Sequence, residues 1–161
     1  MQKTLMIDPA KCSGCRICEA ACSFGKIEAC APAQSRIKIV KYEAQGIAIP
    51  IVCAHCKEPP CQWACPLDII AVDPFSGRVV TREEACVGCK ACMVACIYGA
   101  VSYDPARGVA VHCDHCDGDP LCVKYCPTGA LQYVPVELAD MPGRRQMASR
   151  LSEAAVAARG F

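Results

Sequence analysis

Residues 86–96 have the sequence CVGCKACMVAC, in which gaps of two, two and three residues separate four cysteines. Two-residue gaps let Cys86, Cys89 and Cys92 curl around one centre, because successive sulfurs can reach adjacent corners of it. Cys96 falls beyond that loop, where the segment CMVAC predicts a short helix. The spacing therefore predicts that three cysteines converge and that the fourth points elsewhere.

The same pattern occurs four times along the chain. Every quartet begins C-x-x-C and ends C-x-x-x-C, and only the middle gap varies. The quartets are Cys12, Cys15, Cys18 and Cys22; Cys53, Cys56, Cys61 and Cys65; Cys86, Cys89, Cys92 and Cys96; and Cys113, Cys116, Cys122 and Cys126. A repeat of this kind is the feature from which the fold should be worked out.

Cysteine accounts for 17 of the 161 residues, and it is included in the 53% of residues that count as hydrophobic. Three Phe, one Trp and five Tyr are little aromatic material for a core. Small scaffolds with a thin core commonly gain stability from bound metal. We therefore expect metal ligation to organise this fold.

The N-terminal residues 1–10 lack the basic and apolar regions of a signal peptide. No apolar run approaches the length of about 20 residues that spans a bilayer. We accordingly expect a cytoplasmic protein without a transmembrane segment. In a reducing cytoplasm, an odd total of 17 cysteines argues for metal binding and against a disulfide framework.

The spacing favours cubane iron–sulfur clusters over zinc. A C-x-x-C-x-x-C run with a fourth cysteine that ligates the other cluster is the arrangement of bacterial two-cluster ferredoxins. Pro66 and Pro127 directly follow the last cysteine of their quartets, as in that run. Structural zinc sites use two C-x-x-C pairs further apart or add histidines, and this chain has only three histidines. We predict four [4Fe-4S] clusters.

Short strands should flank the cysteine loops. Alternating or β-branched residues predict strands in KTLMID, RIKIVKY, GIAIPIV, GRVV and GVAVHC. A turn followed by an apolar run predicts three more strands, in PLDIIAVDP, IYGAVSYDP and PTGALQYVP. Short helices should begin in CEAAC and CMVAC, with Cys22 and Cys96 on them. The predicted fold class is α+β.

The motifs DPAKCSGCRICEAAC, CAHCKEPPCQWACP, ACVGCKACMVAC and HCDHCDGDPLCVKYCP resemble those of the four-cluster iron–sulfur subunits of molybdenum and tungsten oxidoreductases. The resemblance covers residues 1–135 and is strongest to the small iron–sulfur subunit of tungsten aldehyde oxidoreductases. It implies two nested bacterial-ferredoxin-like units in a domain of residues 1–136, with an inner unit at about 50–105. The outer unit would come from the flanking segments.

The resemblance also implies how the cysteines pair. Carried over position by position, the ligand sets are Cys12, Cys15, Cys18 and Cys126; Cys113, Cys116, Cys122 and Cys22; Cys53, Cys56, Cys61 and Cys96; and Cys86, Cys89, Cys92 and Cys65. The 20 residues between the second and third quartets also favour the two inner sets. The two outer sets rest on the resemblance.

The expected function is single-electron relay between a catalytic subunit and a redox acceptor, with no catalytic site in this chain. The expected partner is a large tungsten- or molybdenum-pterin subunit, and a flavin subunit or further copies of this chain are additional candidates. Alternatives are a subunit of a formate, carbon monoxide or hydrogen-metabolising complex, or a free polyferredoxin. We see no basic patch that would predict nucleic-acid binding. The formal net charge is +1, and four clusters of about −2 each would change it to roughly −7.

Several residues near the quartets admit a functional and a structural interpretation. His55, His112 and His115 are interpreted as loop residues beside the clusters, since each site already has four thiols. Cys30, outside every quartet, is interpreted as a small buried hydrophobe. Three aromatic residues should keep water off the clusters: Trp63, Tyr98 and Tyr125. Gly14 and Gly88 should have positive φ.

The segment 137–161 contains no cysteine. Pro142 and Gly160 would bound a helix there, with Met147, Leu151, Ala155 and Ala158 at helical spacing. Arg144, Arg145, Arg150 and Arg159 lie largely elsewhere on that helix. It is either a surface helix that packs on its own domain or a C-terminal docking tail for a partner.

Iron and acid-labile sulfide should each approach roughly sixteen atoms per chain, because each cubane contains four of each. Elemental analysis and sulfide determination on anaerobically purified protein check this number. Stoichiometric zinc with little iron would contradict it.

Overall fold

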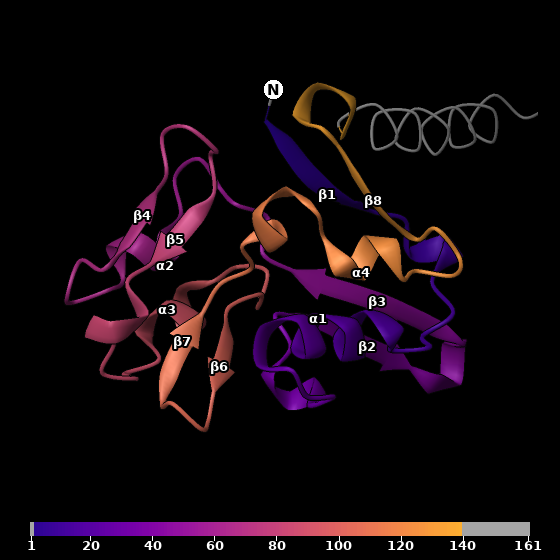
Figure 1. The fold of residues 1–161 in the computed structure, drawn as a ribbon, viewed down its shortest axis with the longest axis horizontal. Helices are drawn as coiled ribbons and strands as arrows, with labels where there is room; N and C mark the ends of the chain where they lie inside the picture. Colours follow the sequence, from indigo (N-terminus) through magenta and orange to yellow (C-terminus); the bar gives the residue numbers. More distant parts are fainter. Residues whose placement is uncertain (1, 140–161) are drawn as a thin grey trace, which may run out of the picture.

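The computed structural model describes residues 2–139 and has a mixed α and β fold, as predicted (Figure 1). The strands are β1 (Lys3–Ile7), β2 (Ile37–Tyr42), β3 (Ile47–Val52), β4 (Ile70–Val72), β5 (Val79–Thr81), β6 (Ser102–Asp104), β7 (Val109–Val111) and β8 (Leu131–Pro135). The helices are α1 (Ile17–Ile27), α2 (Pro60–Trp63), α3 (Ala91–Ala95) and α4 (Leu121–Lys124). The 3-10 helices are η1 (Pro9–Lys11), η2 (Pro32–Gln34), η3 (Glu43–Gln45), η4 (Glu83–Ala85) and η5 (His115–Gly118). Residues 136–139 are helical, and the tail helix predicted between Pro142 and Gly160 lies outside the described residues.

The described strands pair into four antiparallel sheets of two strands each: β1 with β8, β2 with β3, β4 with β5, and β6 with β7. Three of these pairs join strands that are neighbours in sequence. The fourth joins the two ends of the described chain, with Lys3 opposite Pro135 and Ile7 opposite Leu131. The β1–β8 pair therefore closes the chain into a loop around the middle segment.

Two apolar cores divide the structure. One contains buried residues from positions 18–53 and 113–131 and includes Ile37 and Leu131. The other draws only on positions 61–110 and includes Ile70 and Val79. Figure 1 shows the corresponding halves, with α2, α3 and the β4–β5 and β6–β7 hairpins in the middle-segment half. We call the two halves the outer half and the inner half.

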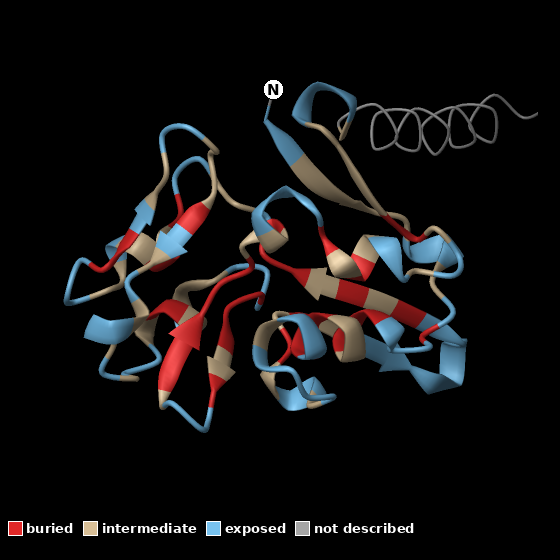
Figure 2. Ribbon diagram, in the orientation of Figure 1, coloured by how far each residue is buried: buried red, intermediate tan, exposed pale blue. Residues whose placement is uncertain are grey.

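Burial follows the side-chain pattern of each strand. β7 is buried along its whole length, whereas β3 alternates between buried and partly buried residues after its exposed first residue (Figure 2). The longest described helix, α1, packs against β2, and the buried Glu19 carboxylate accepts the backbone N–H of Ile39 at 2.7 Å. In the outer half α1 also contacts α4, and in the inner half α2 contacts α3.

All eight segments predicted as strands form strands. The predicted helix around Cys22 is confirmed as α1, but the prediction for Cys96 is wrong: this residue caps α3 with extended backbone angles (φ −73°, ψ 111°) and lies just past the helix. The sequence prediction also missed α2 and α4. Both are single turns that follow a proline, and Pro60 occupies the first turn of α2, where proline is favoured.

Charged side chains join the two halves. Arg36 of the outer half binds Glu83 of the inner half (Nη2 to Oε1, 3.3 Å) and Asp114 (Nη1 to Oδ2, 2.8 Å). Gln34 donates to the buried Asp104 carboxylate at 2.9 Å, and Arg107 donates to the same carboxylate at 2.7 Å. These hydrogen bonds lower the pKa of Asp104 to about 2, with Arg107 the main cause. The seam between the halves is therefore ionic as well as apolar.

Two glycines hold cysteine loops close to hairpins. Gly14 and Gly88 both have the predicted positive φ of +68°. A Cβ at Gly14 would meet the Lys41 side chain of β2 at 2.9 Å and Ala48 of β3 at 3.0 Å. A Cβ at Gly88 would clash with the backbone carbonyl oxygen of Gly108, in the β6–β7 turn. Each glycine thus lets its cysteine loop approach a neighbouring hairpin.

Gly88→Ala should lower the melting temperature of the iron-loaded protein more than Gly46→Ala. Both glycines have positive φ, which costs alanine about 1–2 kcal/mol. Nothing lies within 4 Å of a Cβ at Gly46, so only the change at Gly88 adds overpacking of about 1–3 kcal/mol. Anaerobic thermal unfolding, followed by circular dichroism, checks the difference. Equal shifts would show that the Gly108 carbonyl moves aside without cost.

Candidate metal centres

Four cysteines line one apolar cavity beside α2 and α3. Cys53, Cys56 and Cys61 come from the second quartet, and Cys96 comes from the third. Pro60 begins α2 and directs Cys61 inward, whereas Cys96 reaches the cavity because the chain leaves the helical path at that residue. The structure thus brings together one complete predicted ligand set from two separate quartets.

A second cavity has the complementary composition. Cys86, Cys89 and Cys92 of the third quartet line it together with Cys65 of the second, and its apolar lining includes Ile70. The two cavities therefore exchange their fourth cysteine. The assignment of these eight thiols as cluster ligands stays a prediction. The exchange of the fourth cysteine between the two cavities is the geometry that this prediction requires.

The outer half groups its cysteines similarly. Burial, together with the nearby thiols of Cys22 and Cys116, raises the pKa of Cys122 to about 12. Burial also raises the pKa of Cys113, with Cys122 and Cys22 contributing. Cys22 projects from α1, which packs against α4. These four cysteines are the set that the resemblance implies.

The remaining set contains the first three cysteines and Cys126. Burial raises the pKa of Cys18 to about 12, with smaller contributions from Glu19 and from the thiols of Cys15 and Cys12. Cys126 and Cys12 both pack against the outer apolar core. The backbone N–H of Asp8 donates to the Ala130 carbonyl at 2.8 Å, which joins the loop before Cys12 to the turn after Cys126.

These cavities suit a bound iron–sulfur cluster by their donor chemistry. Burial raises the pKa of Cys53 and of Cys92 to about 11, so without a cation these thiols stay protonated at neutral pH. Thiolates are the form that binds metal, and a bound cation favours ionisation. Soft sulfur donors in a dry cavity favour iron–sulfur clusters and zinc over hard cations such as magnesium.

Backbone N–H groups already point at several of these sulfurs. Arg36 N–H donates to Cys22 Sγ at 3.3 Å, Ala100 N–H to Cys96 Sγ at 3.4 Å, and His115 N–H to Cys113 Sγ at 3.5 Å. Such bonds stabilise a thiolate, and in iron–sulfur proteins they tune the reduction potential. The fold thus supplies hydrogen-bond donors to the predicted ligands.

The three histidines lie beside these cysteines, as predicted for them, with His55 in a loop and His115 at the start of η5. Burial lowers the pKa of His55 to about 3 and those of His112 and His115 to about 4. Neighbouring groups contribute to these lowered pKa values: His115, His112 and then Arg78 for His55, Arg36 for His112, and Arg78 for His115. In the described structure His55 Nε2, His112 Nε2 and both ring nitrogens of His115 are buried without a hydrogen-bond partner. Cluster sulfurs would supply acceptors for such donors.

Two other predictions need correction. Cys30 is exposed, since it follows the end of α1, where Glu28 turns the chain with a φ of 55°; it is not a buried hydrophobe. Trp63 is 72% exposed and lines neither cysteine cavity, so its expected shielding role is wrong. Tyr98 does line the first cavity, although 54% of it is exposed, and Tyr125 is 55% exposed.

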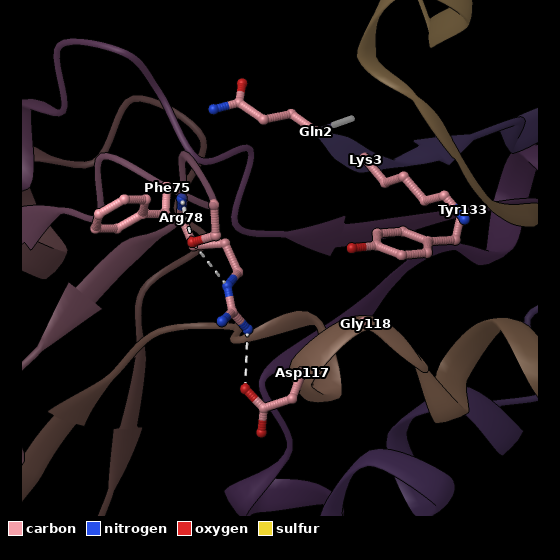
Figure 3. A pocket seen from close by; sticks show the side chains of 8 residues that line it. Gln2, Lys3, Phe75, Arg78, Asp117, Gly118 and Tyr133 are labelled. Atoms are coloured by element: carbon pink, nitrogen blue, oxygen red, sulfur yellow. Dashed lines mark hydrogen bonds and ion pairs between the residues drawn. The ribbon is translucent and has the colours of Figure 1, made fainter.

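A further pocket lies at the seam and contains no cysteine. Gln2, Lys3 and Tyr133 line one side of it, and Phe75 and Arg78 line the other (Figure 3). Arg78 reaches across to Asp117 of η5, with Nη1 3.1 Å from Oδ1. It also donates to the backbone carbonyl of Asp114. Arg78 thereby fastens the loop before α4 to the inner half.

No helix within residues 2–139 combines the length and the apolar character that crossing a bilayer requires.

Comparison with known proteins agrees with the cysteine geometry. Residues 44–135 match the family described as 4Fe-4S dicluster domain. The aliphatic sulfonate oxidoreductase polyferredoxin-like subunit of Pyrococcus furiosus is 43% identical over 123 residues, which cover 76% of this chain and 70% of that protein.

Two other relatives are similar over most of the chain. A subunit of the anaerobic dimethyl sulfoxide reductase of Escherichia coli strain K12 is 33% identical over 156 residues, covering 84% of this chain and 75% of that protein. One component of the solved active site complex BamBC of benzoyl coenzyme A reductase aligns with a TM-score of 0.51 and 26% identity, covering 98% of this chain and 95% of that one.

Cys61→Ala should lower the iron content by about four atoms per chain and reduce soluble yield, because metal binding supplies folding free energy in so small a core. Cys61 is buried in the first cavity, and exposed Cys30 provides the matched control. Cys30→Ala should keep all the iron. Iron analysis of both variants tests the assignment. Full iron in Cys61→Ala would remove Cys61 from the ligand set, and iron loss in Cys30→Ala would place Cys30 in it.

Proposed function

This chain belongs to the 4Fe-4S dicluster domain family, and on that premise we propose that it is a four-cluster electron-transfer subunit of an oxidoreductase complex. The observation that carries the proposal is the exchange of the fourth cysteine between the two inner cavities. Two clusters held this way lie close together by construction. The outer cysteines would repeat the arrangement, so that sixteen cysteines hold four [4Fe-4S] clusters in two nested units.

The burial of the cysteines suggests an order for the four sites. Cys15 of the first quartet and Cys89 of the third are exposed, whereas Cys53 of the second and Cys113 of the fourth are buried. We therefore place the first and third loops at the ends of the electron route, where partners can approach. The buried first cysteines of the second and fourth loops, Cys53 and Cys113, would place their clusters further from the surface.

The clusters, when bound, supply one-electron oxidation and reduction. The residues of this chain hold the ligands, exclude water and set the local charge. Apolar side chains such as Val79 and Ile70 line the inner cavities, and dryness around a cluster helps to set its potential. Substrate chemistry would belong to a separate catalytic subunit.

We propose a tungsten- or molybdenum-pterin oxidoreductase as that catalytic partner, with an aldehyde oxidoreductase first among them. The support is the motif resemblance, together with relatives whose names describe subunits of sulfonate and dimethyl sulfoxide oxidoreductases. A formate, carbon monoxide or hydrogen-metabolising complex, or a free polyferredoxin, is the second candidate. The 43% identity to a polyferredoxin-like subunit is the reason to retain the free polyferredoxin as a candidate.

An affinity-tagged chain purified anaerobically from its native cells should bring with it a large subunit that contains a pterin and tungsten or molybdenum. Mass spectrometry of the eluate and metal analysis identify the partner. Dithionite should bleach the brown colour and produce EPR signals of reduced [4Fe-4S] clusters. A monomeric chain that retains about sixteen iron atoms but binds no subunit would favour the free polyferredoxin.

Truncation after Val136 tests the proposed docking role of the tail. The shortened chain should keep roughly sixteen iron atoms, because every predicted ligand precedes that residue, but it should lose association with the catalytic subunit. Size-exclusion chromatography with iron analysis of the same sample separates the outcomes. Full co-elution would assign the tail to packing, and iron loss would assign it to the fold.

A further inference from the structure

His55 and His115 occupy equivalent places in two cysteine loops, and their side chains meet at the seam. His55 follows Cys53 in C-A-H-C, and His115 follows Cys113 in C-D-H-C. Their ring centroids are 4.2 Å apart, and the rings are nearly perpendicular, at 79°. The second and fourth predicted ligand loops therefore touch through their imidazoles.

The His55 ring also lies close to sulfurs of both loops. Its Nδ1 is 3.9 Å from Cys53 Sγ. A ring nitrogen of His55, one of His115 and Cys113 Sγ all lie within 4.8 Å of one another. One side chain thus reaches between a predicted ligand of the second quartet and a predicted ligand of the fourth.

Adjacent residues of the inner half hold this pair in place. The backbone N–H of Val79 donates to His55 Nδ1 at 2.9 Å, which puts the ring proton of neutral His55 on Nε2. Arg78 fastens the loop of His115 through Asp117 and the Asp114 carbonyl. His115 is only 2% exposed, and its ring also packs on Tyr133, 5.3 Å away between centroids.

Both histidines have left-handed backbone angles, with φ of 48° at His55 and 54° at His115. For a residue other than glycine this costs on the order of 1–3 kcal/mol, and such strain persists where the surroundings impose it, often at functional sites. The ring nitrogens without partners add a second cost of burial. Packing alone would be served better by apolar side chains here.

We propose that His55 and His115 form the electronic contact between the inner and outer halves. They would be positioning residues that set the route between the cluster held by the Cys53 set and the cluster held by the Cys113 set. The proposal rests on the proposed four-cluster function. With clusters bound, an electron leaving one of them would enter the other, and the imidazoles would gain and lose neither electrons nor protons.

The physical basis is the steep decay of electron tunnelling with distance and with empty space along the path. Packed rings that lie between sulfurs of both loops carry the electronic coupling better than a gap or a mobile water. The neutral ring can also donate its free N–H to a sulfur, which a hydrocarbon side chain cannot do. The seam thus gains a fixed bridge where the loops of His55 and His115 meet.

His55→Asn and His115→Asn test the proposal in the full iron-loaded chain. Asparagine tolerates positive φ, and its carbonyl can still accept the Val79 N–H, but it removes the far edge of the ring. His112→Asn is the matched control for loss of an imidazole beside a predicted cluster, since His112 also lines the first cavity and is 4% exposed, but binds Thr81 (Nδ1 to Oγ1, 2.8 Å). Pulse radiolysis with microsecond optical detection measures how fast an injected electron redistributes, and EPR-monitored titration measures the midpoint potentials.

We expect redistribution between the halves to slow by an order of magnitude in His55→Asn and His115→Asn, with iron content and potentials retained, and to stay at the wild-type rate in His112→Asn. Wild-type rates in both seam variants would overturn the proposal, as would equal slowing in His112→Asn. If both seam variants lost iron and His112→Asn did not, the imidazoles would serve to retain the clusters instead. If the wild type bound one metal ion more than its clusters contain, and both seam variants lost that ion, the two histidines would belong to a mononuclear metal site. Wild-type protein without clusters would instead refute the four-cluster function itself.

Discussion

Buried cysteine thiols are the constraint on which this structure depends. A thiol in a dry cavity resists ionisation, which is why the pKa values of Cys53, Cys92 and Cys122 lie at about 11 to 12. Metal binding requires the thiolate, so the free energy of ligation must offset that cost and then hold the fold. The described sheets need such help, because two-stranded sheets are marginally stable by themselves. Cavities that draw cysteines from distant quartets therefore join elements that the backbone ladders leave separate.

Strand placement followed from local sequence because each strand has its own alternation or β-branched run and a turn beside it. Lys3–Ile7 and Leu131–Pro135 were predicted individually, although only the family resemblance suggested that the chain ends belong together. The single-turn helices α2 and α4 escaped prediction, since four residues are too few to show helical periodicity. Cys96 was placed on a helix for the opposite reason: periodicity continues through it, while the backbone turns away to reach the cavity.

Contacts across the seam could not be predicted from the sequence, for a physical reason. Arg36 binds Glu83 and Asp114 through single side chains whose partners are far away in sequence, and nothing local marks them. The exposure of Cys30 and Trp63 depends likewise on where α1 and α2 end against the rest of the fold. The cysteine spacing, in contrast, encodes its own geometry. Gaps of two residues restrict which sulfurs can share a centre wherever the loop is placed.

Electronic coupling between the two halves depends on contacts that neither half provides alone. Each inner cavity exchanges a cysteine with its neighbour, so coupling within the inner half is built into the backbone. The two inner cavities contain no cysteine of the outer sets, and the His55 and His115 side chains meet between the inner and the outer ligand loops. The strained imidazoles of His55 and His115, with ring nitrogens that lack a hydrogen-bond partner, are costly there. Arg78 holds the loop of His115, and the Val79 N–H holds the His55 ring. The repeat that duplicates the ligand loops also duplicates the histidine. A contact across the seam therefore arises wherever two such loops face each other.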